Sequence, residues 1–327
     1  MFVNSKFILK NSTQIRKKFC IGRLKELSTK AAPTDYLKGS TTHFGFEEVA
    51  INEKEGKVRG VFSNVANNYD MMNDFMSGGL HRLWKDELLN MTGVASIAPA
   101  LRASCAREVS VDQTKSILKP GSLLKILDVA GGTGDIAFRF LEAASCPERS
   151  KSSGLDEISI TVCDINPDML RVGEKRARER YGDSVLDDAK SITFEEGNAQ
   201  ELPFDDNTFD IYTIAFGLRN VTDVDMALRE ANRVLKPGGR FLCLEFSHVT
   251  DPVLAAMYDQ YSFHVIPALG ELVANDRPSY QYLVESIRKF CKQEELNTRL
   301  ERNGFVGCQF TNMTKGIVAV HEGWKKL

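Results

Sequence analysis

From residue 123 onward, short apolar runs alternate with longer segments in which apolar residues recur every three or four positions. Short uninterrupted runs are typical of buried strands, and the longer spacing is typical of amphipathic helices. The runs predict strands at Leu123–Val129, Ile158–Cys163, Ile192–Glu195, Phe209–Ala215 and Gly239–Glu245. The periodic segments predict helices at Ile136–Ala144, Asp168–Tyr181 and Asp223–Leu235. This alternation predicts an α/β fold with a doubly wound, mostly parallel sheet covered by helices on both faces.

Two further regions flank this pattern. A stretch from about Glu47 to Met91 has apolar residues in helical spacing and predicts an N-terminal helical extension outside the sheet. Residues Gly93–Gly121 mix small, polar and charged residues and predict an insertion or linker. The C-terminal region predicts a long helical segment from Pro252, followed by strand-like runs at Phe305–Asn312 and Ile317–His321. The chain is thereby divided into residues 1–34, 35–122 and 123–327.

The first 34 residues are strongly basic. They contain one acid, Glu26, and eight basic residues: Lys6, Lys10, Arg16, Lys17, Lys18, Arg23, Lys25 and Lys30. A basic segment that is poor in acids and interspersed with Ser and Thr is typical of a mitochondrial transit peptide. A disordered basic tail is the alternative, because one sequence cannot establish a cleavage site.

The composition of the whole chain argues against a nucleic-acid-binding protein, a metalloprotein and a membrane-spanning protein. With 43% hydrophobic and 26% charged residues and a formal net charge of -2, the chain gives no sign of a nucleic-acid partner. The seven cysteines and five histidines are dispersed, without the paired spacing of zinc ligands or of a disulfide framework, so we predict no metal. No segment approaches the roughly 20 apolar residues of a membrane span, so we expect a soluble or peripheral protein.

A glycine-rich turn, Ala130–Asp135, follows the first predicted strand. In an open parallel sheet the ligand binds beyond the carboxyl ends of the strands, and glycines there let the main chain approach it closely. We therefore expect a cofactor to contact Gly131, Gly132, Thr133 and Gly134. The turn alone does not identify the cofactor, because it also satisfies a loose dinucleotide-binding pattern.

Two later segments add candidate cofactor contacts. Asp164 ends the second predicted strand, where a carboxylate can accept hydrogen bonds from both hydroxyls of an adenosine ribose. A helix cap before Pro167 is the alternative role for Asp164. Its distance along the chain from the glycines is long because of a predicted surface insertion at Ser145–Ser159. Asn198 and Ala199 follow the third strand and could contact an adenine ring, although this segment is also compatible with a plain turn.

Further along the chain come Leu202-Pro203-Phe204, then Phe209-Asp210, then Leu235–Gly239, whose proline and glycines predict the end of a helix before the next strand. In this order, after the glycine turn and Asp164, the motifs resemble the class I S-adenosylmethionine-dependent methyltransferases, whose fold is Rossmann-like. The resemblance implies S-adenosylmethionine as the cofactor. A nicotinamide-dependent dehydrogenase is the weaker alternative, since no residue set for hydride transfer stands out.

Arg219 and Asn220 follow the fourth predicted strand at its carboxyl end, which places them beside the expected cleft. As candidate catalytic residues, Arg219 could stabilise an oxyanion and Asn220 could orient a ring hydroxyl of the methyl acceptor. The alternative for Arg219 is an ion pair with a structural carboxylate.

Several segments from about His43 to the C-terminus narrow the resemblance further. They are Thr42–Phe46, Tyr69–Asp74, His81–Lys85, Arg219–Asn220, Leu244–Ser247, Tyr261–Pro267 and Ser279–Ile287. Together they resemble the C-methyltransferases of ubiquinone and menaquinone biosynthesis, whose mitochondrial members act on 2-methoxy-6-polyprenyl-1,4-benzoquinol.

The resemblance implies C-methylation of a reduced benzoquinol that carries a polyprenyl tail. It also implies a peripheral location on the matrix side of the mitochondrial inner membrane, with other subunits of a ubiquinone-synthesis complex and the membrane surface as partners. Apolar residues in Met257–Val273 are a candidate wall for the tail or a membrane-facing lid, with a buried core helix as the alternative. A methyltransferase-like subunit that stabilises the complex without catalysis is the second functional hypothesis.

Overall fold

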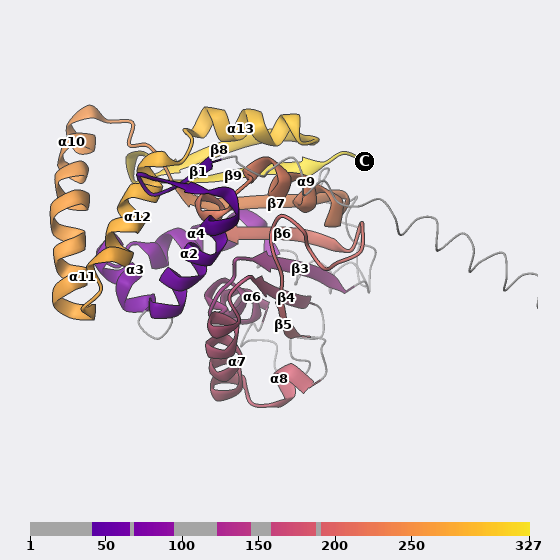
Figure 1. Ribbon diagram of the computed structural model, residues 1–327. Coiled ribbons are helices and arrows are strands. Elements are labelled where there is room, and N and C mark those ends of the chain that lie inside the picture. The colour runs from indigo at the N-terminus through magenta and orange to yellow at the C-terminus, as the bar shows by residue number, and fades with distance from the viewer. Residues whose placement is uncertain (1–40, 66–68, 95–122, 145–157, 188–190) are drawn as a thin grey trace, which may run out of the picture. The chain divides into compact units, whose positions relative to one another are not determined.

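A computed structural model describes residues 41–65, 69–94, 123–144, 158–187 and 191–327 (Figure 1). The predicted transit peptide, residues 1–34, lies outside the described residues. So do residues 95–122 and 145–157, which make up most of the two predicted insertions.

One seven-stranded sheet forms the centre of residues 42–327, with its strands in the order β5-β4-β3-β6-β7-β9-β8. The strands are β3 (Leu124–Val129), β4 (Ile158–Asp164), β5 (Ile192–Glu196), β6 (Phe209–Ala215), β7 (Leu235–Phe246), β8 (Phe305–Met313) and β9 (Val318–Lys325). The five strands from β5 to β7 run parallel, and β9 and β8 complete the sheet in antiparallel pairing. The prediction of a doubly wound, mostly parallel sheet is confirmed.

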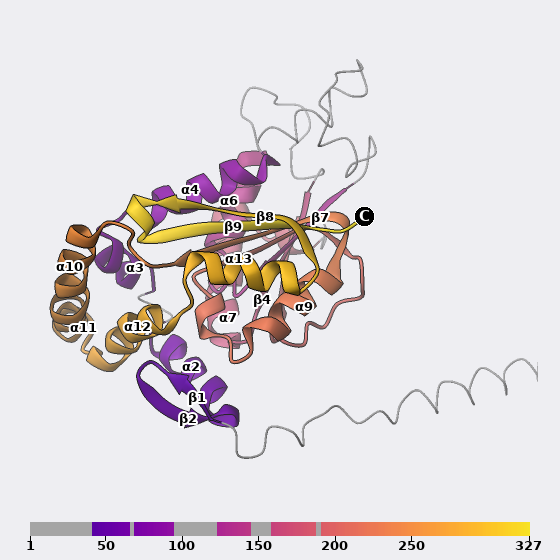
Figure 2. The same ribbon diagram turned by 90° about the horizontal axis from the view of Figure 1, so that it is seen from above.

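Helices cover both faces of the sheet because successive residues of each buried strand point to opposite sides. In β3, Ile126 packs into a core with α4 and α6, whereas Leu127 packs into a second core with α9 and α13. Figure 2 shows α4 on one side of β7 and β9, with α9 and α13 on the other. The helices are α4 (His81–Thr92), α6 (Asp135–Ala144), α7 (Pro167–Tyr181), α8 (Ser184–Asp187), α9 (Val224–Val234) and α13 (Gln293–Arg302).

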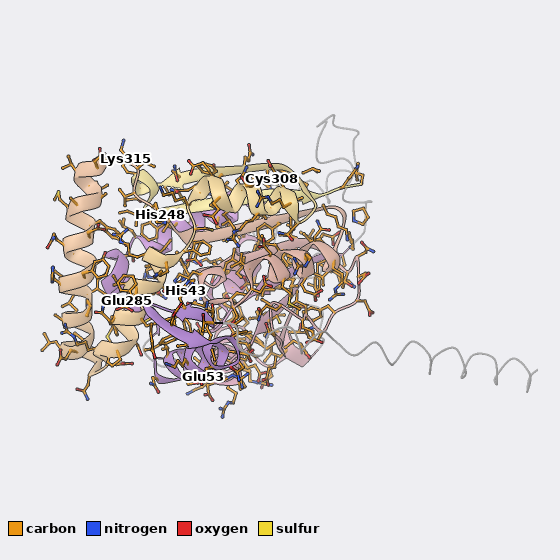
Figure 3. All side chains as sticks on the ribbon, turned by 45° about the horizontal axis from the view of Figure 1, so that its top comes forward. His43, Glu53, His248, Glu285, Cys308 and Lys315 are labelled. Carbon is orange, nitrogen blue, oxygen red and sulfur yellow. The ribbon has the colours of Figure 1, made fainter. Side chains whose placement is uncertain are left out.

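The N-terminal extension is mainly helical, as predicted from about Glu47 to Met91, but it begins with a hairpin. It contains β1 (Thr41–Phe44), β2 (Glu47–Ala50), α2 (Ile51–Val65), α3 (Tyr69–Ser77) and then α4. The prediction of helix was wrong for β2, because Gly45, at a φ of 59°, turns the chain into a hairpin. A residue far away in the sequence stabilises the hairpin turn, because the Phe46 main-chain N–H donates a hydrogen bond to Glu285 Oε2 at 2.9 Å (Figure 3).

At the end of α9 the structure confirms one expectation and corrects another. Helix α9 ends at Val234, as the proline and glycines of Leu235–Gly239 predicted, but β7 begins at Leu235 and not at Gly239. Lys236 Nζ donates to Asp210 Oδ1 at 2.7 Å, which ties this first part of β7 to β6. The segment contains a proline and a glycine with positive φ, Gly238. Leu235 pairs with Phe209 and Arg240 pairs with Ile211, so residues 236–239 interrupt the regular pairing with β6.

The predicted C-terminal helical segment consists of several elements: α10 (Pro252–Gln260), a π-helical turn η6 (Tyr261–Val265), α11 (Ile266–Ala274) and α12 (Arg277–Lys289). Two strands, β8 and β9, follow α13 as predicted. Among the described residues, none of the helices combines the length and the apolar character needed to cross a membrane.

Alanine substitutions at two helical glycines test how closely α7 packs on the glycine turn. At Gly60 an added Cβ would meet nothing within 4 Å, so Gly60→Ala should raise the free energy of unfolding by about 0.5–1 kcal/mol through helix propensity. At Gly173 the added Cβ would lie 2.6 Å from the Phe194 ring and 3.2 Å from the Thr133 carbonyl carbon. Gly173→Ala should therefore lower that free energy by about 1–3 kcal/mol. Urea unfolding measures both, and equal stabilisation by the two variants would contradict the tight packing.

Candidate active site

A cavity of about 1060 Å³ lies at the carboxyl ends of the central parallel strands. The turns after β3, β4, β5 and β6 form one side of it, and α2 contributes the other side through Glu55, Val58, Arg59 and Phe62. This is the expected place for a ligand in an open α/β sheet. The α2 contribution was not predicted, since its apolar spacing identified a helix but not what the helix covers.

The glycine turn lines the cavity with main-chain atoms. Ala130 and Gly132 have φ of 51° and 54°, a conformation that is strained for alanine and open to glycine. A Cβ at Gly131 would lie 2.7 Å from Val162 Cγ1 and 2.8 Å from Asp128 Oδ2, so the main chain passes here without room for a side chain. Of the predicted contacts in this turn, Gly131, Gly132 and Thr133 line the cavity.

Gly134 has a different place. It is not among the residues that line the cavity. Its φ is 83°, and a Cβ there would lie 3.1 Å from the Phe138 ring. Gly134 therefore shapes the start of α6, rather than presenting its own atoms to a ligand.

Asp164 lies in the cavity, as predicted for a ribose contact. Its Oδ2 accepts from the Gly132 N–H at 2.9 Å and its Oδ1 accepts from the Asn166 N–H at 2.8 Å. Burial raises the pKa of Asp164 to about 6, although these main-chain donors favour the charged form. The helix cap considered for Asp164 is made by Asn166 instead, whose side chain accepts from Asp168 and Met169 N–H groups at the start of α7.

A second buried carboxylate, Asp128, was missed in the sequence. It lies in β3 just before the turn, lines the cavity, and accepts from Thr213 Oγ1 at 2.8 Å. Its Oδ2 has no hydrogen-bond partner within the described parts of the chain. Burial raises the pKa of Asp128 to about 7. The available signal was an acid inside an otherwise apolar strand directly before a glycine turn, because such an acid is costly unless it serves a ligand.

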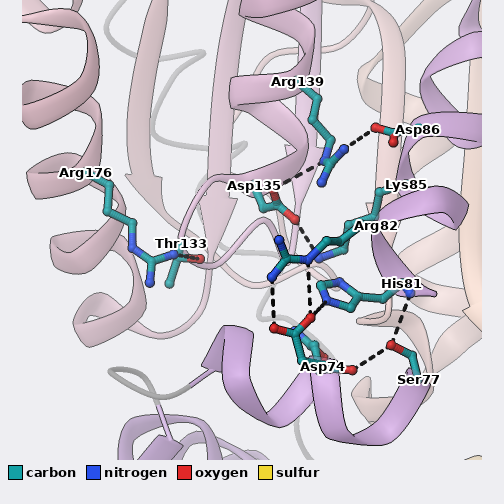
Figure 4. A network of polar contacts seen from close by, with 11 residues as sticks. Asp74, Ser77, His81, Arg82, Lys85, Asp86, Thr133, Asp135, Arg139 and Arg176 are labelled. Carbon is teal, nitrogen blue, oxygen red and sulfur yellow. Dashed lines mark hydrogen bonds and ion pairs between the residues drawn. The ribbon is translucent and has the colours of Figure 1, made fainter. Parts of the chain in front are cut away.

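An ion-pair network joins α4 to the first turn of α6 (Figure 4). The buried Lys85 donates to Asp135 Oδ2 at 2.6 Å, and Arg139 pairs with both Asp135 and Asp86. Burial alone would raise the pKa of Asp135, but Lys85, Arg139 and His81 together outweigh burial, and the pKa lies below its ordinary value. On the other side of the turn, Arg176 donates to Thr133 Oγ1 at 3.2 Å. Charged side chains thus fix the turn from both flanks.

Asn198 and Ala199 both line the cavity. Asn198 Nδ2 donates to Glu55 Oε2 at 3.1 Å, which connects the turn after β5 to α2. Asn198 Oδ1 accepts from the Gln200 N–H at 2.9 Å, the pattern of a side-chain-stabilised turn. Asn198 therefore stabilises a turn, as in the alternative interpretation of this segment, and it also lies where it can contact a ligand.

Arg219 and Asn220 lie in a short 3₁₀ turn, η5 (Leu218–Asn220), after β6. The Arg219 guanidinium is buried, pairs with Glu245 Oε1 at 2.9 Å, and donates to Ser286 Oγ at 3.3 Å. Arg219 does not line the cavity, so the structure shows the ion pair that was the alternative to a guanidinium in the cleft. The physical reason is that a buried cation needs a compensating charge, and Glu245 is next to it.

Asn220 does line the cavity. Its Oδ1 accepts from the Tyr282 hydroxyl at 2.9 Å, and the Tyr282 ring stacks on Phe44 of the hairpin with centroids 4.0 Å apart. Burial raises the pKa of Tyr282 well above its ordinary value, so the hydroxyl stays protonated and donates. Asn220 is thereby held between the sheet, α12 and the N-terminal hairpin.

Comparison with known proteins identifies the family. Residues 50–325 match the model of the ubiE/COQ5 methyltransferase family. The chain belongs to the ubiE/COQ5 methyltransferase family. Among similar proteins is one named 2-methoxy-6-polyprenyl-1,4-benzoquinol methylase, mitochondrial, from Arabidopsis thaliana, which is 49% identical over 294 residues, covering 88% of this chain and 92% of that protein. Proteins of the same name from Gallus gallus and Homo sapiens are each 46% identical, covering 88% of this chain and 90% and 85% of theirs.

Membership of the ubiE/COQ5 methyltransferase family agrees with the fold and with the position of the cavity. The family resemblance inferred from the sequence segments is confirmed, as is the class I methyltransferase fold. Within this family member, the glycine turn, Asp164 and Asn220 converge on one cavity although they are up to 90 residues apart in sequence, and only Arg219 and Gly134 among the predicted site residues point elsewhere.

Removing one partner of the Arg219–Glu245 pair should be far more damaging than removing both. Glu245→Ala leaves a buried guanidinium without its counter-charge and should lower the free energy of unfolding by about 3–5 kcal/mol. The double variant Glu245→Leu with Arg219→Met removes both charges and should recover most of that loss. Urea unfolding compares the two, and an equal loss in both would show that packing, not charge pairing, dominates.

Proposed function

We propose that this chain is an S-adenosylmethionine-dependent C-methyltransferase of ubiquinone biosynthesis. Its acceptor would be a reduced benzoquinol with a polyprenyl tail, the 2-methoxy-6-polyprenyl-1,4-benzoquinol named for its relatives. The observation that carries the proposal is one cavity, in a member of this family, that combines a side-chain-free glycine turn with two buried carboxylates.

The donor end of the cavity suits S-adenosylmethionine. Asp164 presents a carboxylate for the two ribose hydroxyls, and Asn198 and Ala199 suit the adenine ring. Gly131–Thr133 offer a close main-chain approach, and Asp128 offers an unpaired buried oxygen that a positively charged group would satisfy. When bound, S-adenosylmethionine supplies a methyl group on a positively charged sulfur.

The acceptor end needs to make a phenol ring electron-rich. A phenolic group has a pKa of about 10, so little of it is ionised at neutral pH without help, and loss of its proton increases electron density on the ring carbons. Asn220 is the residue we place against the ring hydroxyl, because it lines the cavity and is oriented by Tyr282. Arg219 acts indirectly by positioning Asn220, because the ion pair of Arg219 with Glu245 fixes the turn that carries Asn220.

The setting that we propose is the matrix side of the mitochondrial inner membrane. The relatives are named as mitochondrial, and residues 1–34 have the composition of a transit peptide. Peripheral attachment to the membrane and association with other subunits of a ubiquinone-synthesis complex belong to the same proposal. The domain division at residues 34 and 122 also remains a proposal.

Transfer of a labelled methyl group from S-adenosylmethionine to the ring carbon of a reduced, short-prenyl benzoquinol tests the activity directly. Asn220→Ala should lower kcat at least about tenfold with little change in donor affinity, because it removes one polar contact to the acceptor. Asn198→Ala is the matched control at the donor end, and it should weaken donor binding instead. Donor binding without any transfer would favour the alternative of a non-catalytic, complex-stabilising subunit.

Donor affinity should depend on pH through Asp164. Its charged form accepts hydrogen bonds from the ribose hydroxyls, so affinity should be full above a pH of about 6 and fall below it, as the carboxyl takes up a proton. Between pH 7 and pH 5 the loss should be about tenfold, the change in the ionised fraction. Calorimetric titration measures it, and Asp164→Asn should bind weakly at both pH values. Asp128→Asn tests whether the other buried acid is responsible instead.

A further inference from the structure

The helical run Pro252–Ala274, made of α10, η6 and α11, has an apolar side that faces away from the rest of residues 42–327. In Figure 1 the run forms one edge of the fold, and α12 lies between it and the sheet. Its exposed side chains recur at helical spacing and define what we call the outer face: Pro252, Val253, Ala256, Met257, Gln260, His264, Val265, Ala268, Glu271, Leu272 and Val273. Helix α10 has no buried residue, although it is mainly apolar.

The exposure of these side chains is unusual within this molecule. Leu272, Val253 and Met257 are 81%, 72% and 66% exposed, and five of the eleven exposed large hydrophobic residues among the described part lie on this run. The run contains no lysine or arginine. Its two acids, Asp259 and Glu271, pair with Arg288 and Arg277 of α12. An extended apolar face of this kind marks an interaction site.

The inner side of the same run borders an apolar cavity. Four buried aliphatic side chains line it, Ile266 from α11 and Leu283, Val284 and Ile287 from α12, together with Tyr258, Ser262 and Arg288. The space between these side chains is small and mostly apolar. The π-helical turn η6 contributes to this wall, and such turns are frequent at functional sites.

Two occupants of the outer face can be weighed, a lipid bilayer and a second copy of the chain. A run of this length is about 35 Å long, and one helix is about 10 Å wide, so the face offers roughly 350 Å². A stable dimer needs about 800 Å² from each partner. A bilayer requires no such minimum, since an apolar helix face binds by entering the boundary between headgroups and acyl chains.

We propose that the outer face of Pro252–Ala274 is the surface on which the chain lies on a lipid bilayer, with Val253, Met257 and Leu272 inserted below the headgroups. The inference rests on the proposed function in one respect, because a prenyl-tailed acceptor resides in the bilayer. Since the face carries no lysine or arginine, attachment through it is mainly apolar and does not require anionic lipids.

Flotation of the full chain with neutral phosphatidylcholine vesicles at about 1 M salt tests the surface. Under these conditions the electrostatic contribution of the basic residues 1–34 is removed. Met257→Glu with Leu272→Glu should reduce the vesicle-bound fraction at least about tenfold. The matched control is Met226→Glu with Val306→Glu, two exposed apolar residues on α9 and β8, and it should bind as the unaltered chain does. Far-UV circular dichroism and the thermal midpoint check that both variants fold.

Three results would overturn the proposal: no binding of the unaltered chain to neutral vesicles, equal binding by both double variants, or a dimer in sedimentation that only the Met257/Leu272 variant dissociates. The last result would assign the face to a second copy. The proposed function can be refuted independently of this surface. If vesicle binding behaves as expected but no methyl group reaches a short-prenyl benzoquinol, the surface stands and the activity is wrong.

Discussion

Asp128, Asp164 and Glu245 are buried near the carboxyl ends of β3, β4 and β7, and a buried carboxylate is costly unless hydrogen bonds or an opposite charge surround it. The arrangement around the cavity follows from how each is compensated. Glu245 pairs with Arg219 and so fixes the turn that carries Asn220. Asp164 accepts hydrogen bonds from main-chain N–H groups, and the one from Gly132 holds the glycine turn in place. Asp128 is compensated only in part, by Thr213.

Because the three buried carboxylates are compensated by different groups, the parts of the cavity near them have different electrostatic properties. At the donor end, Asp128 and Asp164 have raised pKa values of about 7 and about 6, so both carboxylates favour a ligand that donates hydrogen bonds or carries positive charge. Elsewhere, the charge of Glu245 is neutralised by Arg219, and Asn220 presents an uncharged side chain to the cavity. In the function that we propose, the carboxylates would face the cationic donor, and Asn220 would face the neutral aromatic acceptor.

The sequence was sufficient for the features that depend on local pattern. The strands of the sheet, the helices between them and the glycine turn were predicted from periodicity and spacing, because buried parallel strands and amphipathic helices have distinct periods. Asp164 was placed in the cavity by its position at a strand end alone. The same reasoning failed for Glu47–Ala50, where a contact to Glu285, 239 residues away from Phe46, accompanies the hairpin. It also could not choose between a free and a paired Arg219, since Glu245 is distant in sequence. Long-range contacts decide such cases, and periodicity does not contain them.

The incomplete compensation of Asp128 has a thermodynamic consequence. A carboxylate whose burial raises its pKa lowers the stability of the ligand-free fold at neutral pH, because the charged form is disfavoured in the folded state. A ligand that supplies the missing positive charge or hydrogen-bond donor removes this penalty, and the free energy recovered adds to its affinity. The ligand-free fold is therefore less stable, but a ligand that compensates Asp128 binds more tightly and more selectively. A neutral analogue of the same shape would not gain this contribution to the binding free energy.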